Sequence, residues 1–285
     1  MSSNSNPTPG TLWVVATPLG NPGDLSPRAR TCLEKADAVL AEDTRRAALA
    51  CSRWGVGVKR LISLHDHNED RKKDEVLSLL REGRDLALIS DAGMPVLADP
   101  GYVTVRACRE ADLPVSVVPG PCAPVTALAG SGIPPQPFAF FGFLPRRRSD
   151  QEAALAPYAR IPVTLVFFER KDRLTDTLTL AARLLGPREA CLARELTKTH
   201  EEYRRFRLEQ LPPLDDILGE VTVILGPPER LERTPRAEVE ALIADEIPKG
   251  GAPREVARRV RARADGWTTG EIYSMLPRMG RPSRD

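Results

Sequence analysis

The stretch from residue 90 to residue 132 constrains the fold of this chain more than any other. The apolar run at residues 86–89 precedes it and has the length of a buried strand. A polar loop follows, and then a predicted helix with Asp99 as N-cap and Pro100 at the first helical position. A second strand, at residues 115–118, ends on another glycine loop. This strand–helix–strand unit predicts a parallel sheet whose loops gather at its carboxyl edge, where ligands bind.

Both loops contain candidate ligand-binding residues. A glycine lets backbone groups approach a ligand closely, although a glycine in a loop can equally serve only to make a turn. Two glycine loops in one unit favour a ligand site. The candidates in and just after these loops are Ser90, Asp91, Ala92, Gly93, Pro95, Pro119, Gly120, Pro121, Ala123, Thr126 and Ala127.

Composition indicates a globular protein of two domains with an appendix. The chain has 285 residues, 41% hydrophobic and 28% charged, and these proportions are ordinary for such proteins. A net charge of +2 argues against a uniformly basic nucleic-acid coat, so any such contact must use local patches. Five scattered cysteines predict free thiols in a reducing cytoplasm. No apolar run is long enough to span a membrane, and residues 1–10 are expected to form a disordered tail.

The N-terminal half alternates predicted strands and helices. Strands are expected at residues 12–16, 38–40 and 61–64, with helices after Ser26 and over residues 74–81. The loop at residues 17–24 lacks the glycine spacing of a phosphate loop. Acids and arginines follow the second strand at residues 42–46, where they can form either a functional cluster or an ion-pair set within a helix. This pattern predicts an α/β domain.

Three further segments each leave two interpretations open. The histidines of the segment at residues 65–68 could bind a metal, but no third ligand is evident nearby, so polar groups that face a substrate are favoured. The aromatic run at residues 138–144 could stack on bases, although a buried strand between domains is favoured. The arginines at residues 146–148 form either a solvated turn or a phosphate contact.

The remaining chain predicts a second α/β domain and then a helical module. Strands are expected at residues 162–168, 190–193 and 221–225, with a helix over residues 173–185. Three helices follow, at residues 236–247, 254–264 and 269–276, and the second of these is rich in arginine. This pattern is typical of helix-turn-helix modules, which hold nucleic acid or serve only as packing appendages.

Several motifs occur together in an order that resembles a known family. They are ATPLGNPGDLSPRA, AEDTRR, LHDHNE, SDAGMPVLADPGY, VPGPCAPVTAL, GFLP, LARELTKTHEE and GEVTVILG. Together they resemble the small-subunit ribosomal RNA methyltransferase I family of the tetrapyrrole-methylase superfamily, densely over residues 12–226 and more loosely beyond.

The resemblance implies a fold, a cofactor and an RNA substrate. The expected fold is two α/β domains, residues 11–121 and 122–228, with S-adenosylmethionine in the cleft between them and a helical module at residues 229–285. The expected reaction is 2'-O-methylation of a cytidine ribose in the decoding region of 16S rRNA, within the small ribosomal subunit. A cytoplasmic homodimer with no membrane contact is also expected.

The motif match and the chemistry of the side chains together suggest site residues. Asp43 is the first candidate to accept the proton of the ribose hydroxyl, with Glu42 and Glu195 behind it. Arg45 and Arg194 would position phosphate or orient these acids. Phe168 and Leu196 join the two glycine loops as expected cofactor-binding residues, and no metal is expected.

Three positions depart from the family pattern. Met94 stands where the family usually has threonine, and Arg170 stands where it has a small hydroxyl residue. Residues 267–269 replace the lysines that usually precede the last helix, which weakens the case for RNA contact there. Two other functions stay open: methylation of a tetrapyrrole or similar ring, and RNA binding without catalysis. The arginine-rich module argues against the first, and the intact glycine loops argue against the second.

Overall fold

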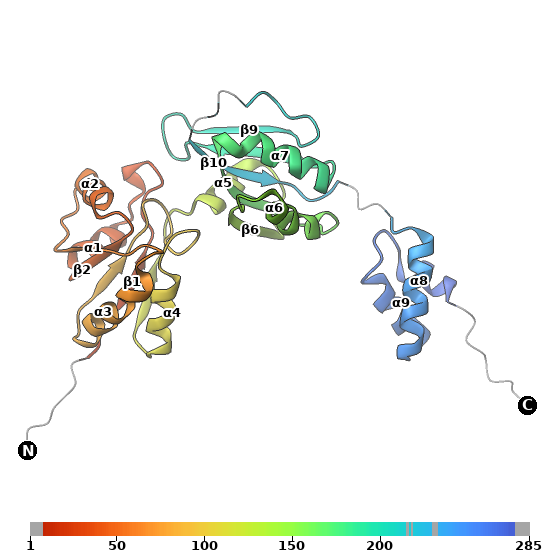
Figure 1. Ribbon diagram of the computed structural model, residues 1–285, viewed down its shortest axis with the longest axis horizontal. Helices are drawn as coiled ribbons and strands as arrows, with labels where there is room; N and C mark the ends of the chain where they lie inside the picture. Colours follow the sequence, from red (N-terminus) through yellow and green to blue (C-terminus); the bar gives the residue numbers. More distant parts are fainter. Residues whose placement is uncertain (1–7, 215–216, 218, 230–232, 277–285) are drawn as a thin grey trace, which may run out of the picture. The chain divides into compact units, whose positions relative to one another are not determined.

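The structure is a computed structural model that describes residues 8–214, 217, 219–229 and 233–276 (Figure 1). Residues 1–7 of the predicted tail lie outside the described residues. The chain divides into two compact units. The first contains the residues up to Ala159 together with Val163–Pro227, and the second contains Arg160–Pro162 and the chain from Pro228 onward.

The first unit begins with a five-stranded parallel sheet in the order β3-β2-β4-β1-β5. The sheet is buried on both faces, as all-parallel sheets are, and this explains why its strands are short apolar runs. The predicted strands are confirmed to within a residue. The strands are β1 (Leu12–Val15), β2 (Ala38–Ala41), β3 (Leu61–Ser63), β4 (Leu86–Leu88) and β5 (Val115–Val118).

Helices cover both faces of this sheet. On one face α1 (Pro27–Lys35) and α2 (Thr44–Trp54) pack through a shared apolar core. On the other face α3 (Glu69–Arg81) and α4 (Tyr102–Glu110) do the same (Figure 1). The predicted cap of α1 is confirmed, because the Ser26 hydroxyl accepts a hydrogen bond of 3.1 Å from the Ala29 N–H.

The predicted start of α4 at Asp99 is wrong. The helix begins at Tyr102, after Gly101, and its first N–H groups are satisfied by Glu69 from α3. This buried carboxylate accepts hydrogen bonds from the backbone N–H groups of Thr104 at 2.7 Å and Gly101 at 3.2 Å. A negative charge at a helix N-terminus is favourable, so Glu69 performs the capping role that the sequence suggested for Asp99. Asp99 is thereby left available for another role.

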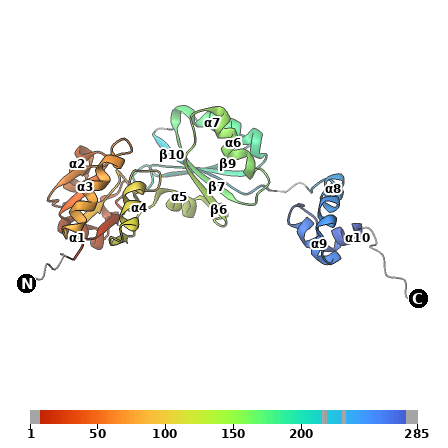
Figure 2. The same ribbon diagram turned by 60° about the horizontal axis from the view of Figure 1, so that its bottom comes forward.

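A second five-stranded sheet follows in the order β6-β7-β10-β8-β9. Only the β6–β7 pair is parallel, and the other pairs are antiparallel. Helix α5 (Ala123–Ser131) covers one face, while α6 (Arg148–Leu155) and α7 (Lys171–Leu185) cover the other (Figure 2). The strands are β6 (Phe138–Phe143), β7 (Thr164–Arg170), β8 (Glu189–Arg194), β9 (Glu202–Arg207) and β10 (Glu220–Leu225).

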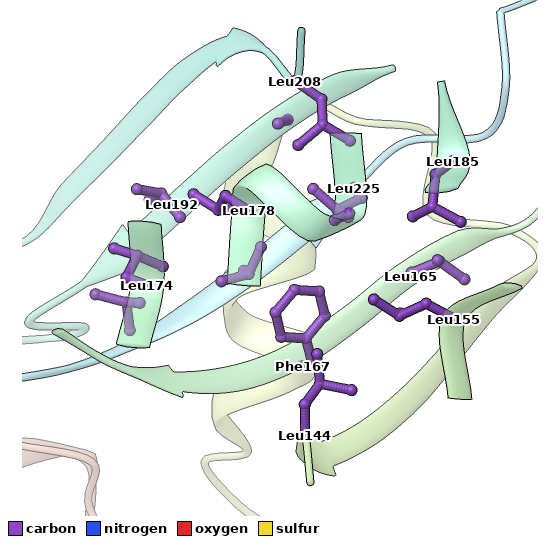
Figure 3. Close-up of a cluster of buried hydrophobic side chains, with 14 of the residues drawn as sticks. Leu144, Leu155, Leu165, Phe167, Leu174, Leu178, Leu185, Leu192, Leu208 and Leu225 are labelled. Atoms are coloured by element: carbon purple, nitrogen blue, oxygen red, sulfur yellow. The ribbon is translucent and has the colours of Figure 1, made fainter. Parts of the chain in front are cut away.

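The core of this half lies between the sheet and helices α6 and α7 (Figure 3). Phe167 of β7 is fully buried there, and leucines from α6 and α7 surround it. Neighbouring residues of the same strand face the other side of the sheet, because side chains alternate along a strand. Val166, for example, packs in the cluster that contains Ala127 and Leu128 of α5.

Two predictions for this half need correction. Strand β9 was not predicted, because its six residues, EYRRFR, are mostly charged and form a partly exposed edge strand. The aromatic run is strand β6 as expected, but it is the opposite edge strand and is not buried. Its end residues Phe138 and Phe143 are 42% and 41% exposed. Arg147 and Arg148 begin helix α6.

A fully buried arginine holds the point where the chain passes between the two units. Arg188 donates hydrogen bonds to the carbonyl oxygens of Tyr158 at 2.6 Å and Gly226 at 2.9 Å. Longer contacts reach the carbonyl oxygens of Ala159 and Val163. Burial lowers the pKa of the guanidinium to about 10. One side chain therefore joins the segments of the first unit that lie next to its boundaries.

The second unit is a small helical module with its own core. Helices α8 (Arg236–Glu246), α9 (Pro253–Arg261) and α10 (Thr269–Met275) pack around buried Val239, Val256 and Ile272. Thr268 and Glu271 form a capping box at the start of α10. Part of the predicted module, residues 230–232 and 277–285, lies outside the described residues.

The predicted fold class is confirmed: two sheets with interleaved helices precede a C-terminal helical region. The predicted boundary at residue 122 falls between β5 and α5, within one compact unit, so it stays a prediction. Within the described residues, no helix is both long and apolar enough to cross a membrane.

Candidate functional site

A cavity of about 730 Å³ opens where loops of the parallel sheet meet the second sheet. Its size falls within the range of roughly 300–1,000 Å³ typical of small-molecule sites. The parallel sheet contributes loops that follow β1, β2, β4 and β5, and the second sheet contributes strand ends. The lining residues used below are Leu19, Glu42, Arg46, Asp91, Ala92, Met94, Asp99, Ala123, Phe143, Phe168, Arg194, Glu195, Leu196, Lys198 and Thr222.

Direct contacts tie these loops together. Thr17 and Gly93 exchange backbone hydrogen bonds of 2.8 and 3.0 Å, which join the loops after β1 and β4. The Asn21 N–H donates to the Thr197 hydroxyl at 3.1 Å, which joins the loop after β1 to the loop after β8. A Cβ at Gly20 would lie 2.4 Å from the Lys198 side chain, so a larger residue there would force that side chain to move. The cavity walls are therefore held by protein contacts from both sheets.

The backbone is strained in two of the lining loops. Val96 and Ala98, after β4, have φ values of 76° and 66°. Glu195 and Thr197, after β8, have φ values of 51° and 65°. Non-glycine residues rarely adopt this conformation, which costs of order 1–3 kcal/mol each and is concentrated at functional sites. The strain marks both loops as parts of a site.

Three carboxylates that line the cavity, those of Glu42, Asp99 and Glu220, have no cationic partner in an ion pair among the described residues. Glu42 lies directly after β2, and Asp99 lies in the loop after β4. Burial, followed by the charge of Glu42, raises the pKa of Asp99 to about 7. Burial, followed by the charges of Asp91 and Asp66, also raises the pKa of Glu42. Asp99 is therefore suited to exchange a proton near neutral pH.

Other charged residues of the cavity are paired. Arg46 binds Asp91 at 2.6 Å, and Lys198 binds Glu195 at 2.9 Å. Arg194 binds Glu202 at 2.5 Å and holds the pKa of that carboxyl low. Glu195 and Arg194, both candidates from the sequence, thus line the cavity but already hold partners.

The structure gives Asp43 a different place from the one expected of a proton acceptor. Its carboxylate is the N-cap of α2 and accepts hydrogen bonds from the N–H groups of Arg45 at 2.8 Å and Arg46 at 3.2 Å. These bonds lower the pKa of Asp43. Neither Asp43 nor Arg45 lines the cavity, whereas the neighbouring Glu42 and Arg46 do. Capping explains why a residue with a short side chain that ends in a hydrogen-bond acceptor occupies this position.

The candidate cofactor-binding residues divide into a cavity-lining set and a supporting set. Those that line the cavity are Asp91, Ala92, Ala123, Phe168 and Leu196. Those that do not are Ser90, Gly93, Pro95, Pro119, Gly120, Pro121, Thr126 and Ala127. Among the second set, the buried Ser90 donates to the Ala92 carbonyl at 3.1 Å and so shapes the loop.

The two glycines of that supporting set are explained by packing within the protein. A Cβ at Gly93, whose φ is 81°, would lie 2.9 Å from the Leu19 side chain. A Cβ at Gly120 would lie 3.0 Å from the Cβ of Ala16. A larger residue at either position would therefore collide with the loop after β1. This differs from our expectation that the glycines leave space for a ligand.

Sequence reasoning missed Asp99 and Arg46 as cavity residues. Asp99 was placed in a helix cap, and Arg46 was grouped with Arg45 without distinction. The usable signal for Asp99 was its position, because a carboxylate in the loop after a parallel strand lies at the ligand-binding edge. Arg46 could have been identified only from its distance to Asp91.

Three other segments have local structural roles. In the histidine segment, Asn68 accepts a hydrogen bond from the His65 N–H at 2.9 Å and thereby shapes the turn into α3. No group of three His, Cys, Asp or Glu residues suited to a metal ion occurs in the described part of the chain. Glu169, just before Arg170, is fully buried and bound to Arg173 and Thr177. Of the two family departures near the expected cleft, Met94 lines the cavity and Arg170 does not.

Comparisons with known proteins agree on the family. Residues 11–212 match the family model described as Tetrapyrrole (Corrin/Porphyrin) Methylases. The "Ribosomal RNA small subunit methyltransferase I" of Micromonospora olivasterospora is 41% identical over 280 residues, 95% of this chain and 89% of that protein.

Solved structures share the fold at lower identity. The crystal structure of the methyltransferase CobJ is 19% identical and has a TM-score of 0.61 over 80% of this chain and 96% of that one. Uroporphyrin-III C-methyl transferase from Thermus thermophilus, solved with S-adenyl homocysteine, is 21% identical, with a TM-score of 0.51 over 76% of this chain and 97% of that one.

Proposed function

The chain belongs to the ribosomal RNA small subunit methyltransferase I family within the tetrapyrrole methylases, and from this premise we propose that it methylates 16S rRNA with S-adenosylmethionine. The observation that carries the proposal is the cavity at the carboxyl edge of the parallel sheet, with Glu42 and Asp99 inside it and no cation bound to either among the described residues. A cavity with unpaired carboxylates is suited to a cationic ligand.

The lining of the cavity fits such a ligand. S-adenosylmethionine carries a sulfonium and an ammonium group as well as a flat adenine. Glu42 and Asp99 can hold positive charge, while Leu19, Leu196 and Phe168 offer apolar surface to the adenine. Two neighbouring rings hold Phe168 in place. Phe140 packs edge-on against it with ring centroids 5.1 Å apart, and Phe143 packs in a tilted arrangement at 5.4 Å. Ala92 and Ala123 keep the loop and the start of α5 narrow.

The reaction needs orientation more than activation of the methyl group. When bound, S-adenosylmethionine supplies a methyl carbon on a good leaving group, and the carbon–sulfur bond breaks as the oxygen–carbon bond forms. Holding the reacting atoms in line can contribute roughly 7–11 kcal/mol. The strained loops after β4 and β8, fixed by protein contacts, are suited to such positioning.

The ribose hydroxyl is a weak acid, so a proton acceptor is required. We assign this role to Glu42, because it lines the cavity, is more exposed than Asp99 and has a raised pKa. Asp99 lies near Glu42 and provides a second carboxyl whose pKa is about 7. Asp43, our first candidate from the sequence, becomes the residue that fixes the start of α2 and thereby the backbone beside Glu42.

The finer features of the substrate follow the family resemblance. We propose that the acceptor is the 2'-hydroxyl of a cytidine in the decoding region, that the RNA is presented within the small ribosomal subunit, and that the enzyme acts as a cytoplasmic homodimer. The C-terminal module, with five arginines in and just after α9, supports an RNA substrate over a tetrapyrrole.

Methyl transfer from labelled S-adenosylmethionine tests the proposal. Small ribosomal subunits, free 16S rRNA and a tetrapyrrole are offered side by side, and the labelled nucleotide is identified by digestion and mass spectrometry. Label in a 2'-O-methylcytidine of the decoding region is the expected result. Transfer to the tetrapyrrole alone, or binding of RNA with no transfer to any acceptor, would overturn it.

A further inference from the structure

The arginines of the C-terminal module fall into two groups. Arg259 and Arg263 point to α8, where they bind Glu246 at 2.8 and 3.0 Å. Arg263 also binds Asp245 at 2.9 Å, and Lys249 binds both acids. The Glu246 side chain is only 6% exposed, and these hydrogen bonds lower its pKa to about 2. This group of charges holds α8 and α9 together.

Arg254, Arg258 and Arg261 form the second group, here called the free-arginine face. They occur at positions i, i+4 and i+7 of α9, so they lie along one side of the helix. All three are exposed, and none has an ion-pair or side-chain hydrogen-bond partner among the described residues. The nearby Glu255 is engaged at the helix start, where it accepts a hydrogen bond from the Ala252 N–H at 3.2 Å.

This arrangement works against the stability of the isolated helix. Like charges at i, i+4 repel each other on a helix surface, and Arg254 places a positive charge in the first turn, where the helix dipole disfavours it. Some other exposed arginines are paired within their helices, as Arg236 is with Glu240 at 2.9 Å and Arg106 with Glu110 at 2.7 Å. What distinguishes α9 is that three unpaired arginines follow one another along one side of a single helix. A row of negative charges on a partner would relieve this repulsion.

We propose that the free-arginine face of α9 binds the phosphate backbone of the RNA substrate, whereas Arg259 and Arg263 are structural. The proposal rests on the proposed function for the identity of the RNA. The face extends over two turns of helix, so its guanidinium groups lie a few ångströms apart along the axis, as the phosphates of a nucleic acid strand do. Arginine suits the role because its planar group can bind phosphate oxygens in pairs.

Salt-dependent RNA binding by the full chain tests the proposal. The triple variant Arg254→Gln, Arg258→Gln, Arg261→Gln is compared with a control that also loses three exposed arginines, Arg106→Gln, Arg183→Gln, Arg236→Gln, each ion-paired in the structure. The control has the same change in net charge. Affinity for fluorescein-labelled 16S rRNA is measured over a range of salt concentrations without cofactor.

The free-arginine variant is expected to flatten the plot of log affinity against log salt by about 2 to 3 units, since each lost phosphate contact removes roughly 0.7 to 0.9. Near physiological salt the affinity then falls on the order of 100-fold. The control should keep the wild-type slope within about half a unit.

Three outcomes would overturn the proposal: equal slopes for both variants, wild-type protein without affinity for the RNA, or a defect seen with ribosomal subunits but not with free rRNA, which would indicate a protein partner. Circular dichroism confirms that the variants are folded. Calorimetric titration with S-adenosylhomocysteine, expected to be unchanged, reports on the cleft separately. Loss of RNA binding in the variant supports the proposal even if the wild-type protein transfers no methyl group to RNA, so failure of the proposed function is distinguishable.

Discussion

The cleft and the C-terminal module leave opposite charges without partners. In the cleft, arginine and lysine residues are bound to acids, and the carboxyl groups of Glu42, Asp99 and Glu220 remain without an ion pair among the described residues. In the module, Asp245 and Glu246 each form ion pairs with two or more basic side chains. The three arginines of the free-arginine face have no ion-pair partner among the described residues. The difference fits a cationic cofactor in one region and a polyanion at the other.

The contrast also explains why net charge is a poor guide to this protein. A value of +2 over 285 residues averages an acid-bearing cavity with a basic helix face. Function follows from which charges remain unpaired, and pairing is a property of the folded chain.

Replacing Glu42, the proposed proton acceptor, should have the largest effect, and this effect should be on the rate of methyl transfer. Glu42→Gln is expected to slow methyl transfer by about 10²- to 10⁴-fold, because the ribose hydroxyl loses its proton acceptor. Single-turnover assays with saturating cofactor measure this rate. Asp43→Asn is the matched control, since asparagine caps helices as well as aspartate does, and it should change the rate less than about 3-fold. The reverse order would restore Asp43 as the proton acceptor.

A second prediction concerns the packing of the loops that form the walls of the cleft. Gly93→Val is expected to lower the free energy of unfolding by about 3 kcal/mol, because valine must adopt a positive φ and displace Leu19. Gly57→Val is the control, since a Cβ there meets nothing within 4 Å. Urea denaturation measures both variants. A folded Gly93→Val protein of normal stability that has lost cofactor affinity would show instead that this glycine borders the ligand.

A third prediction uses the raised pKa of Asp99. The folded protein keeps the Asp99 proton up to about pH 7, whereas the unfolded chain releases it near its ordinary value of 3.8. The unfolded state therefore binds fewer protons in this window, and Asp99 makes the protein less stable as pH rises through it. The free energy of unfolding of Asp99→Asn should equal that of the wild type near pH 4 and exceed it by about 2 kcal/mol near pH 8. This difference is smaller than the full pKa shift would give, because Asp99 is partly exposed to solvent. Urea unfolding at the two pH values measures the difference, and a difference that does not vary with pH would contradict the prediction.

The smallest effect is expected when an unpaired carboxylate is added to the cleft instead of being removed from it. Arg46→Gln frees Asp91 and adds an unpaired carboxylate to the cleft. Because the Arg46–Asp91 pair is exposed and screened by solvent, the effect is expected to be small. Affinity for S-adenosylmethionine should rise up to about 5-fold, with little change for S-adenosylhomocysteine, which lacks the sulfonium charge. Calorimetry with both ligands measures the ratio, and an equal change for both would argue against charge selection.

Elements with a strong local pattern could be predicted from the sequence. The runs at residues 12–15 and 86–88 are continuously apolar because the parallel sheet is buried on both faces, and Ser26-Pro27 carries a local cap signal. The charged edge strand β9 lacks such a pattern, because its pairing with β8 is a long-range property. The sequence therefore predicted the layers of the fold better than the edges of its sheets.

The position of the candidate site in the fold could be predicted from the sequence, but the side chains that face the cavity could be predicted only in part. Loops after parallel strands had to share one edge, which placed Glu42 and the segment after residue 90 together. Whether Asp43 or Glu42 faces the cavity depends on the direction of one turn, and the capping bonds to Arg45 and Arg46 settle it. Asp99 could not be identified as a cavity residue from the sequence, because the helix cap that it was expected to form is formed instead by Glu69, which is distant in sequence.

The hydrogen bonds of Arg188 have a mechanical consequence for the wall of the cavity. Strand β10 begins at the cavity, where Thr222 is a lining residue, and ends beside Gly226, whose carbonyl Arg188 holds. The same guanidinium holds the carbonyl oxygen of Tyr158, which belongs to the same unit and precedes the boundary after Ala159. A pull on the chain beyond Gly226 is thus resisted by this anchor before it reaches the register of β10. We therefore expect the register of β10, and with it the position of Thr222 in the cavity wall, to be insensitive to movements of the helical module.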